Sequence, residues 1–267
     1  MNSISDQLTH STIRIECKTS SGTCSGTGFF FNFLVSEDNK SGVPCIVTNK
    51  HVINDAIDGT LIVSCKINNA TYHETIHVSD FKQAWLFHPD PNIDLCIMPF
   101  LPIMESLAKQ GKQPSIVWFD KSLIPTKEQI DNLTAIEDII MIGYPDGIWD
   151  SINNKPIFRK GITATHPKYN FNGKKEFLID ASCFPGSSGS PVIIFNQGSY
   201  TNGNGIAIGN RLYFMGIMYA GPQHTAIGNI RFATPTTHTK IPNNLGVVIK
   251  AEQLLTFENI LEKIVNR

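Results

Sequence analysis

The chain is divided into many short apolar segments rather than a few long ones, and this division limits its fold most strongly. Twelve segments are rich in Val, Ile, Phe and Thr and are bounded by Gly, Asn, Asp or Pro, which is typical of β-strands. We predict strands at 12–17, 26–34, 45–48, 60–67, 73–78 and 95–98 in the first half, and at 138–144, 158–166, 176–182, 191–195, 211–220 and 245–250 in the second.

The even division of these segments predicts two β units, because twelve twisted strands rarely remain in one open sheet. We therefore expect an all-β protein with one unit at 1–110 and another at 136–250, joined by a more polar linker at 111–135. The stretch 196–205 is rich in Asn and Gly, which predicts a surface hairpin loop.

The last segment, 251–267, is the one stretch with a clear helical period. Leu254, Phe257, Leu261 and Ile264 recur at spacings of three and four residues, which places them on one face of an amphipathic helix. We expect this face to pack on the protein's own β unit. A helix that binds a partner is the alternative.

Composition and charge exclude several classes of function. The 267 residues carry 22 basic and 23 acidic side chains, and no run of like charge suits a nucleic acid or an anionic membrane. The first residues lack the basic and apolar regions of a secretory signal, and no stretch is long and apolar enough to span a bilayer. We therefore expect a soluble, cytoplasmic protein. Because we expect no secretion, we predict that its six cysteines are reduced. They form no CxxC pair, and we predict neither a metal nor a cofactor.

Residues 73–77 read HETIH, the HExxH pattern in which two histidines of a helix bind zinc. The Thr, Tyr and Ile residues around the pattern favour a strand instead. On a strand the two histidines lie about 13 Å apart, too far to share one ion. We therefore predict that His73 and His77 are strand residues rather than ligands of a common zinc.

The stretch FPGSSGSPV at 184–192 contains Ser187, Ser188 and Ser190 among glycines and prolines. This composition is typical of an ordinary surface turn, but it also suits a serine nucleophile held in a tight turn. A serine nucleophile needs a general base, an acid that orients the base, and backbone donors for the oxyanion. The stretch alone does not decide between these interpretations.

His51 and Asp94 can supply the base and the orienting acid. His51 follows the predicted strand 45–48, and Asp94 precedes the next apolar run. Taken singly, His51 is also interpretable as a surface histidine and Asp94 as part of a turn before a strand. Their order along the chain, His51, Asp94 and then Ser188, puts the first two in the first β unit and the serine in the second. We therefore expect a site in the cleft between the units.

The sequence resembles the trypsin/chymotrypsin-fold serine peptidases, and within them the bacterial Deg-type and glutamyl-endopeptidase-like branches. The resemblance rests on GTGFFF, TNKHV, NIDLCIM, IGYP, DASCFPGSSGSPV and MGIMYAG, which follow one another in family order over nearly the whole chain. It implies two six-stranded antiparallel β-barrels, the chymotrypsin-like double barrel, followed by the C-terminal α-helix. It also implies that Ser188 is the nucleophile, that His51 is the general base and then acid, and that Asp94 orients His51.

The resemblance assigns further positions. The backbone N–H groups of Gly186 and Ser188 would form the oxyanion hole. The specificity pocket would be lined by Ser182, Cys183, Phe184, Tyr219, Ala220 and Gly221. Because Ser182 stands where a trypsin-like member holds an acidic residue, a preference for Lys or Arg in the substrate is disfavoured. His166 and His224 are candidates for contacting an acidic or amide side chain, with solvent-exposed bystanders as the alternative.

The sequence departs from the digestive members of the family at Ser187, where those enzymes carry an aspartate that pairs with a new N-terminus. Activation through that ion pair is therefore excluded. The expected function is a cytoplasmic serine endopeptidase that makes limited cuts in an intracellular protein or peptide substrate through an acyl-enzyme, with a regulatory protein as a possible partner. The alternative is a catalytically silent double barrel that binds peptides or serves as a scaffold.

Overall fold

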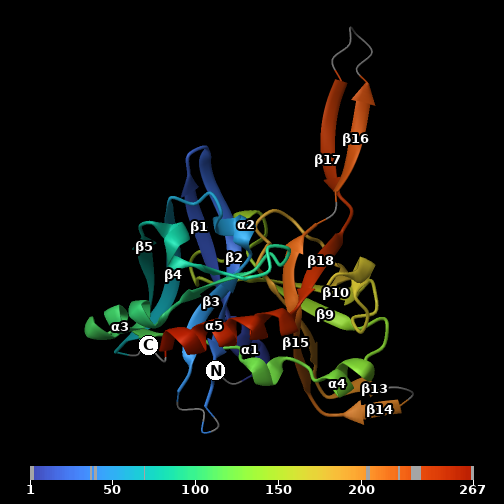
Figure 1. Ribbon diagram of the computed structural model, residues 1–267, viewed down its shortest axis with the longest axis horizontal. Coiled ribbons are helices and arrows are strands. Elements are labelled where there is room, and N and C mark those ends of the chain that lie inside the picture. Colours follow the sequence, from blue (N-terminus) through green and yellow to red (C-terminus); the bar gives the residue numbers. More distant parts are fainter. Residues whose placement is uncertain are drawn as a thin grey trace.

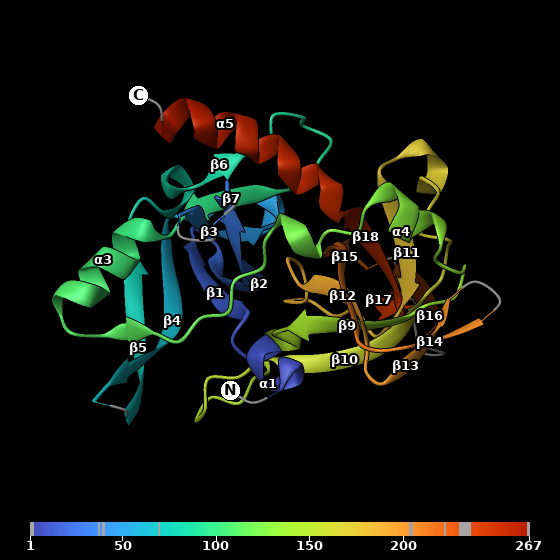
Figure 2. The same ribbon diagram turned by 90° about the horizontal axis from the view of Figure 1, so that it is seen from below.

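The computed structural model describes residues 3–36, 38, 41–68, 70–202, 205–221, 223–229 and 236–265, with the backbone alone at 202, 220, 223–229 and 236–242. Within these residues the chain forms two β units joined by a segment with short helices, and the C-terminal helix lies across both units (Figures 1 and 2). In the described part of the chain, no helix has the length and apolar character needed to cross a lipid bilayer.

The first β unit is an antiparallel sheet with the strand order β5-β4-β1-β2-β3-β7-β6, and β8 pairs with β4. Its strands are β1 (Thr12–Thr19), β2 (Gly22–Phe33), β3 (Val43–Thr48), β4 (Asp58–Ile67), β5 (Ala70–Val78), β6 (Leu86–Phe87), β7 (Cys96–Pro99) and β8 (Gln113–Pro114). All six predicted strands are present, and the two-residue strands β6 and β8 are additional. Among the described residues no ladder joins β5 to β6, so a closed first barrel is not confirmed.

The second β unit is a closed barrel with the strand order β10-β11-β18-β15-β12-β9. Its strands are β9 (Asp138–Gly143), β10 (Ile157–Thr163), β11 (Glu176–Asp180), β12 (Pro191–Asn196), β15 (Arg211–Ala220) and β18 (Leu245–Lys250). These are the six strands predicted for the second half of the chain. The six-stranded antiparallel barrel is therefore confirmed for this unit.

Two hairpins lie outside the barrel ladder. β13 (Ser199–Asn202) and β14 (Gly205–Ile208) form the hairpin that the Asn- and Gly-rich sequence predicts, although its strands reach further than the predicted loop. β16 (Gln223–Asn229) and β17 (Thr236–Pro242) form a second hairpin that projects from the barrel (Figure 1). The second hairpin was not predicted, because its Thr and Ile residues alternate with Gly, His and Asn and form no continuous apolar run.

The helices are short apart from α3 and α5. They are α1 (Ile4–Leu8), α2 (Lys50–Ile53), α3 (Leu101–Lys109), α4 (Lys127–Asp131) and α5 (Thr256–Val265), with 3-10 turns η1 (Phe81–Ala84), η2 (Lys121–Leu123), η3 (Pro145–Gly147), η4 (Phe171–Gly173) and η5 (Ala251–Leu255). Helices α3 and α4 were not predicted from the sequence. Helix α4 spans five residues, too few to show a period, and is held by a capping box between Thr126 and Gln129.

The C-terminal helix is confirmed, with two differences from the prediction. The segment starts as the 3-10 turn η5 and becomes α-helical only at Thr256. Leu254, Phe257 and Leu261 are buried, as expected, but Ile264 is 51% exposed. Its assignment to the packed face was wrong, because the apolar cluster beneath the helix ends at Leu261.

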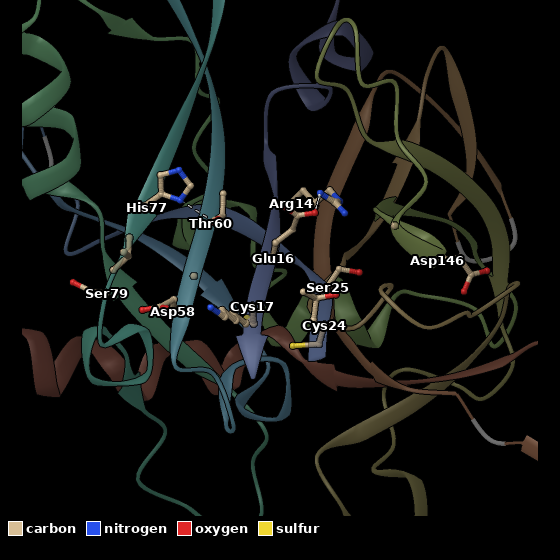
Figure 3. Close-up of a pocket in the computed structure, with 15 residues that line it drawn as sticks. Arg14, Glu16, Cys17, Cys24, Ser25, Asp58, Thr60, His77, Ser79 and Asp146 are labelled. Atoms are coloured by element: carbon tan, nitrogen blue, oxygen red, sulfur yellow. Dashed lines mark hydrogen bonds and ion pairs between the residues drawn. The ribbon is translucent and has the colours of Figure 1, made fainter. Parts of the chain in front are cut away.

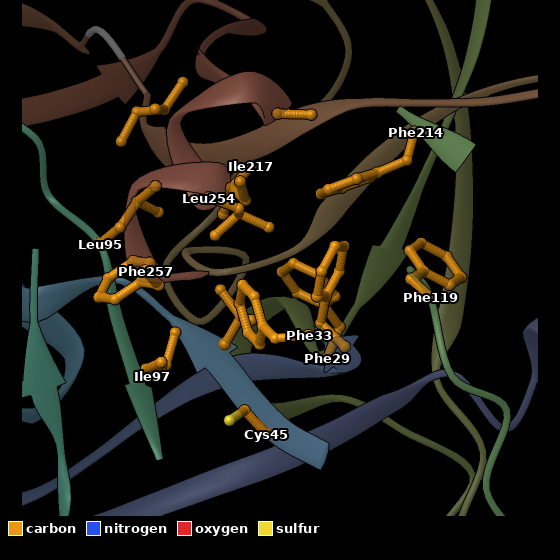
Figure 4. Packing of buried hydrophobic residues seen from close by; sticks show 14 of the residues in the cluster. Phe29, Phe33, Cys45, Leu95, Ile97, Phe119, Phe214, Ile217, Leu254 and Phe257 are labelled. Atoms are coloured by element: carbon orange, nitrogen blue, oxygen red, sulfur yellow. The ribbon is translucent and has the colours of Figure 1, made fainter. Parts of the chain in front are cut away.

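One hydrophobic core connects the two β units and the C-terminal helix (Figure 4). The ring of Phe29 on β2 lies 5.2 Å from that of Phe214 on β15, and Phe119 of the connecting segment lies 5.4 Å from Phe214. Phe33 on β2 packs against Phe257 of α5, with ring centroids 6.2 Å apart. Because these rings interlock across the boundary between the units, they fix the position of one unit against the other.

Candidate active site

The ladder between β3 and β7 brings His51 and Asp94 together. Thr48, the last residue of β3, pairs with Cys96, the first residue of β7. His51 lies three residues after Thr48, in α2, and Asp94 lies two residues before Cys96, so both leave the strand pair at the same end. Asn49 is fully buried and fixes this junction, because its Nδ2 donates to the main-chain oxygen of Asp94 at 2.7 Å.

Asp94 holds His51 through both carboxylate oxygens. The imidazole Nδ1 lies 2.5 Å from Oδ2, and the backbone N–H of His51 donates to Oδ1 at 3.1 Å. With Nδ1 donating to the carboxylate, Nε2 is the ring nitrogen left to accept a proton. The side chain of His51 is 48% exposed and that of Asp94 23% exposed, so the imidazole is open to a reactant while the carboxylate is more enclosed.

Ser188 lies in the tight turn between β11 and β12. The turn is closed by two backbone hydrogen bonds, from Ser187 to the oxygen of Phe184 and from Ser190 to the oxygen of Ser187, each 3.0 Å long. Ser187 and Ser190 are buried and Ser188 is half-buried. Of the three serines considered from the sequence, Ser188 is therefore the one whose hydroxyl is accessible.

The first β unit supports this turn through Thr27 of β2, which is fully buried. Its N–H donates to the oxygen of Ser188 at 2.9 Å, and its Oγ1 donates to the oxygen of Gly186 at 2.9 Å. The same Oγ1 accepts the N–H of Tyr144 at 3.0 Å. Thr27 thus connects β2, the Ser188 turn and the segment that follows β9.

The N–H group of Gly186 is oriented by the peptide bond that precedes it. The oxygen of Pro185 accepts the N–H of Asp146 at 2.6 Å. Because the C=O and N–H of a trans peptide point in opposite directions, this bond turns the Gly186 N–H away from Asp146. Gly186 has φ +84°, and a Cβ at this position would lie 2.5 Å from the oxygen of Tyr144, so the conformation requires glycine.

The N–H group of Ser188 is oriented in the same way, because the oxygen of Ser187 is held by Ser190. Neither this N–H nor that of Gly186 has an acceptor within the described residues. Both backbone donors are therefore free of hydrogen bonds within the described residues. Such a pair can bind the negatively charged oxygen of a tetrahedral intermediate.

The hydroxyl of Ser188 is turned toward β15. Its Oγ donates to the main-chain oxygen of Tyr219 at 3.4 Å, a long hydrogen bond, and none joins it to His51 in the part of the chain that the structure describes. The phenol of Tyr219 donates to Oε1 of Glu176 at 2.9 Å, and burial together with this bond raises the pKa of Tyr219. Ser188 must turn before it can donate a proton to His51.

Two of the predicted pocket residues contact a cation. The guanidinium of Arg159, on β10, donates from Nη1 to the main-chain oxygen of Ser182 at 3.2 Å and lies 4.8 Å from the ring centroid of Phe184. Within the described residues, no carboxylate forms an ion pair with Arg159. The side of the predicted pocket formed by Ser182 and Phe184 therefore carries a positive charge with no ion-pair partner among the described residues.

The remaining predicted pocket residues bring β15 close to the segment before Ser188. A Cβ on Gly221 would lie 3.4 Å from the Cβ of Cys183, so the chain just after β15 contacts the segment before Ser188 at this point. The thiol of Cys183 belongs to the core of the barrel, and its burial raises its pKa to about 11. Ala220 pairs with Val247 in the barrel ladder, and its side chain lies outside the described residues.

The histidines of the HETIH stretch lie on β5, as predicted. His73 hydrogen-bonds through Nδ1 to the hydroxyl of Ser64 at 3.2 Å and through Nε2 to the oxygen of Ile152 at 3.0 Å. His77 hydrogen-bonds through Nδ1 to the hydroxyl of Thr60 at 3.2 Å. The helix that the zinc motif requires is thus replaced by a strand.

The two histidines considered as pocket candidates have different outcomes. His166 packs against Tyr169, with ring centroids 5.3 Å apart, in the loop after β10. The side chain of His224 lies outside the described residues. No contact with Ser182 or Gly221 is found for His166 in the described structure.

Thr27, Asn49 and Arg159 were not predicted as functional residues from the sequence. Thr27 lies within the GTGFFF motif and Asn49 within TNKHV, so the signal for these two residues was present in segments already singled out. Arg159 lies in β10, between the IGYP and DASCFPGSSGSPV motifs and in neither of them, and nothing in its neighbourhood distinguishes it from a solvated surface residue.

Residues 26–200 match the family model of the trypsin-like peptidase domain. Among solved structures, a catalytically inactive tobacco etch virus protease in complex with substrate has a TM-score of 0.50 and 12% identity, over 96% of this chain and 84% of that chain. The serine endoprotease from Yersinia pestis has a TM-score of 0.46 and 18% identity, over 100% of this chain and 68% of that chain. A protease from M. tuberculosis in its active form has a TM-score of 0.45 and 16% identity, over 94% and 80%. No curated protein matches the chain.

Proposed function

Because the chain belongs to the family of trypsin-like peptidase domains and is a serine protease, we propose that His51, Asp94 and Ser188 form its catalytic triad. The observation that carries this proposal is the double contact of Asp94 with His51, at 2.5 Å to Nδ1 and 3.1 Å to the backbone N–H. The carboxylate holds the ring in the tautomer whose Nε2 accepts a proton, and it stabilises the imidazolium that forms.

In the proposed reaction, Ser188 first turns from the oxygen of Tyr219 toward His51. Its Oγ then attacks the carbonyl carbon of the peptide bond while its proton passes to Nε2 of His51. His51 returns this proton to the leaving amine as the C–N bond breaks, which leaves an acyl-enzyme on Ser188. Water that gives its proton to His51 hydrolyses the acyl-enzyme. Hydrogen bonds between catalytic groups are often long or misaligned before substrate binds, so the present orientation of Ser188 is compatible with this sequence.

We propose that the N–H groups of Gly186 and Ser188 bind the oxyanion of the intermediate. This assignment is supported by the two backbone contacts that orient these donors and by their lack of acceptors among the described residues. The contact of Thr27 with Gly186 supports it further, because it anchors the glycine from the first β unit.

The proposed substrate is a protein or peptide that is cut within its chain. We propose that the enzyme makes limited cuts in an intracellular protein and that a regulatory protein is its partner. We propose a complete double barrel with boundaries at 1–110 and 136–250, a linker at 111–135 and a C-terminal helix at 251–267, with the triad between the barrels. Membership of the Deg-type or glutamyl-endopeptidase-like branch stays a prediction.

The charge of Arg159 affects the preference for the substrate side chain that precedes the cleaved bond. The guanidinium contacts Ser182, the position at which an acidic residue would hold a basic substrate side chain. A positive charge there repels Lys and Arg. We therefore propose that basic side chains are disfavoured in this pocket.

The test is intact-mass analysis after exposure to a fluorophosphonate probe, which labels an activated serine. We expect one label on the wild type and on Ser187→Ala, the control that removes the neighbouring buried hydroxyl, and none on Ser188→Ala. Turnover of a peptide substrate should fall on the order of 10⁶-fold in Ser188→Ala. Labelling of Ser188→Ala, or an unlabelled wild type, would contradict the assignment.

A further inference from the structure

A cavity of about 710 Å³ lies between strands β1, β2, β4 and β5 and the turn at Asp146 (Figure 3). Its wall includes Cys17 on β1 and Cys24 on β2. Cys24 is exposed, whereas Cys17 is buried, with 1% of its surface accessible. The proposed reaction uses neither of these thiols.

Cys17 and Cys24 face each other directly across the ladder between β1 and β2. Residues directly opposite in an antiparallel pair project to the same face, with Cα atoms about 4.5 to 5.5 Å apart. This spacing falls within the range of about 4.4 to 6.8 Å that disulfides span. In the described ladders, no other cysteine lies opposite a cysteine.

Both sulfurs also point at one acceptor. The thiols of Cys17 and Cys24 lie 3.4 Å and 3.7 Å from the main-chain oxygen of Val52, each as a donor. These are the hydrogen bonds that this oxygen accepts in the described part of the chain. The two sulfurs therefore share one hydrogen-bond acceptor.

Val52 connects this thiol pair to the proposed general base. It follows His51 in the four-residue helix α2 and is 7% exposed. Its side chain occupies the space that the missing Cβ of Gly26 leaves on β2. The helix that carries His51 is thus held to the β1–β2 hairpin by this packing and by the two thiol hydrogen bonds.

We propose that Cys17 and Cys24 form a redox-sensitive pair that closes to a disulfide on reaction with a low-molecular-weight disulfide such as glutathione disulfide. The Cys24 thiolate attacks one sulfur of the small disulfide and releases one small thiolate. The Cys17 thiolate then attacks the mixed disulfide at the Cys24 sulfur and displaces the second small thiolate. Two protein thiols are oxidised, and one small disulfide is reduced to two thiols, which take up the two protons that the protein thiols lose.

The exposures of the two thiols set the order of these steps. The exposed Cys24 meets the small disulfide first. Burial, reinforced by the neighbouring Cys24, raises the pKa of Cys17, so little Cys17 thiolate is present at neutral pH. Closure of the mixed disulfide should therefore be the slower step and should accelerate as the pH rises.

The disulfide has consequences for His51, and this part of the inference rests on the proposed function. A disulfide has no S–H to donate, so the oxygen of Val52 loses both of its donors. The helix with His51 then keeps its packing on β2 and its hydrogen bonds to Asp94, but it loses the two thiol hydrogen bonds, so the contact between His51 and Asp94 is less firmly held. Oxidation of the pair should lower the reactivity of Ser188.

The disulfide itself is tested by intact mass and peptide mapping after incubation with glutathione disulfide. We expect the wild type to lose about 2 Da, with the new bond between Cys17 and Cys24, at a rate that rises with pH. Cys24→Ser and Cys17→Ser should show no such loss, and Cys65→Ser, which removes a buried cysteine opposite Tyr72, should behave as the wild type. A mixed disulfide that stays on Cys24, or a bond to another cysteine, would overturn the proposal.

The effect on the site is tested by the rate of fluorophosphonate labelling and by the NMR signals of the His51 ring in the reduced and oxidised protein. We expect oxidation to shift the His51 signals and to slow labelling about fivefold, the effect of losing weak hydrogen bonds, with full recovery on reduction. Unchanged signals and rate in a fully oxidised sample would refute the connection to His51. A reduced wild type that is never labelled would count against the proposed triad alone, because the mass and the NMR signals report on the thiol pair independently.

Discussion

Replacing Thr27 by valine removes a single hydroxyl from the support of the Ser188 turn. Valine has the shape of threonine, but it cannot donate to the oxygen of Gly186 or accept the N–H of Tyr144. Thr27 is fully buried, so both groups lose their partner away from water. Each such loss costs about 1–3 kcal/mol, so we expect Thr27→Val to destabilise the fold by about 2–6 kcal/mol. We also expect kcat to fall at least about tenfold at a nearly constant KM, because Gly186 is no longer held for the transition state.

Thr163 provides a matched control for this experiment. It is also buried, its Oγ1 donates to the oxygen of Ala135 at 2.7 Å, and it accepts the N–H of Glu137 at 2.9 Å. Thr163→Val should therefore lose a similar free energy of unfolding in urea while the folded enzyme keeps its kcat. Thr27→Ser, which retains the hydroxyl, should recover most of the kcat lost in Thr27→Val. If the kcat of folded Thr27→Val equals that of Thr163→Val, Thr27 does not position the Ser188 turn.

Three further predictions concern the pocket charge, pH and the C-terminal helix. Arg159→Met should raise kcat/KM for a peptide with Lys before the cleaved bond about tenfold relative to one with norleucine, and an unchanged ratio would contradict the pocket assignment. Burial lowers the pKa of His88 from its ordinary value of 6.5, so the unfolded chain binds the proton more readily. Stability should therefore fall as the pH drops from 6.5 toward the lowered pKa, less steeply in His88→Gln than in the exposed control His77→Gln, and equal slopes in urea unfolding would exclude this cause. Phe257→Ala, which removes a fully buried ring, should cost about 3–5 kcal/mol of unfolding free energy, against about 0.5 kcal/mol or less for Ile264→Ala, and similar losses would contradict the packing of α5.

The strands were predictable from the sequence because most of them carry their own apolar signal. Five of the six barrel strands of the second unit contain a run of Val, Ile, Leu, Phe or Met between turn residues, and all six were found within a few residues of their predicted bounds. The strands β6 and β8 span two residues each, so no period can be seen in them. Helix α3 spans nine residues, and its core-facing residues Ile103, Met104 and Leu107 cover little more than one turn, which is too short to establish a helical period.

Sequence also predicted which residues would meet at the end of β3, since a histidine after one apolar strand and an aspartate before another converge when those strands pair. It could not predict the partner of the Ser188 hydroxyl, because that depends on one side-chain torsion. Tyr219, which accepts this hydroxyl, is 31 residues away along the chain, and Thr27 lies 159 residues from Gly186. Contacts of this kind exist only after the two units have packed.

In the Ser188 turn, the local sequence motif does not by itself orient the groups of the proposed site. Glycine at 186 permits the positive φ of the turn, which is a local property and visible in the sequence. The direction of the Gly186 N–H, however, is set by Asp146 through the oxygen of Pro185, and the glycine itself is anchored by Thr27 from the other unit. The proposed nucleophile was therefore predictable from a short local motif, whereas the orientation of the proposed oxyanion donors depends on residues distant in the chain. Variants at Thr27 should therefore alter catalysis although the GSSGSP sequence around Ser188 is unchanged. If the turn depended on its own sequence alone, they would have no such effect.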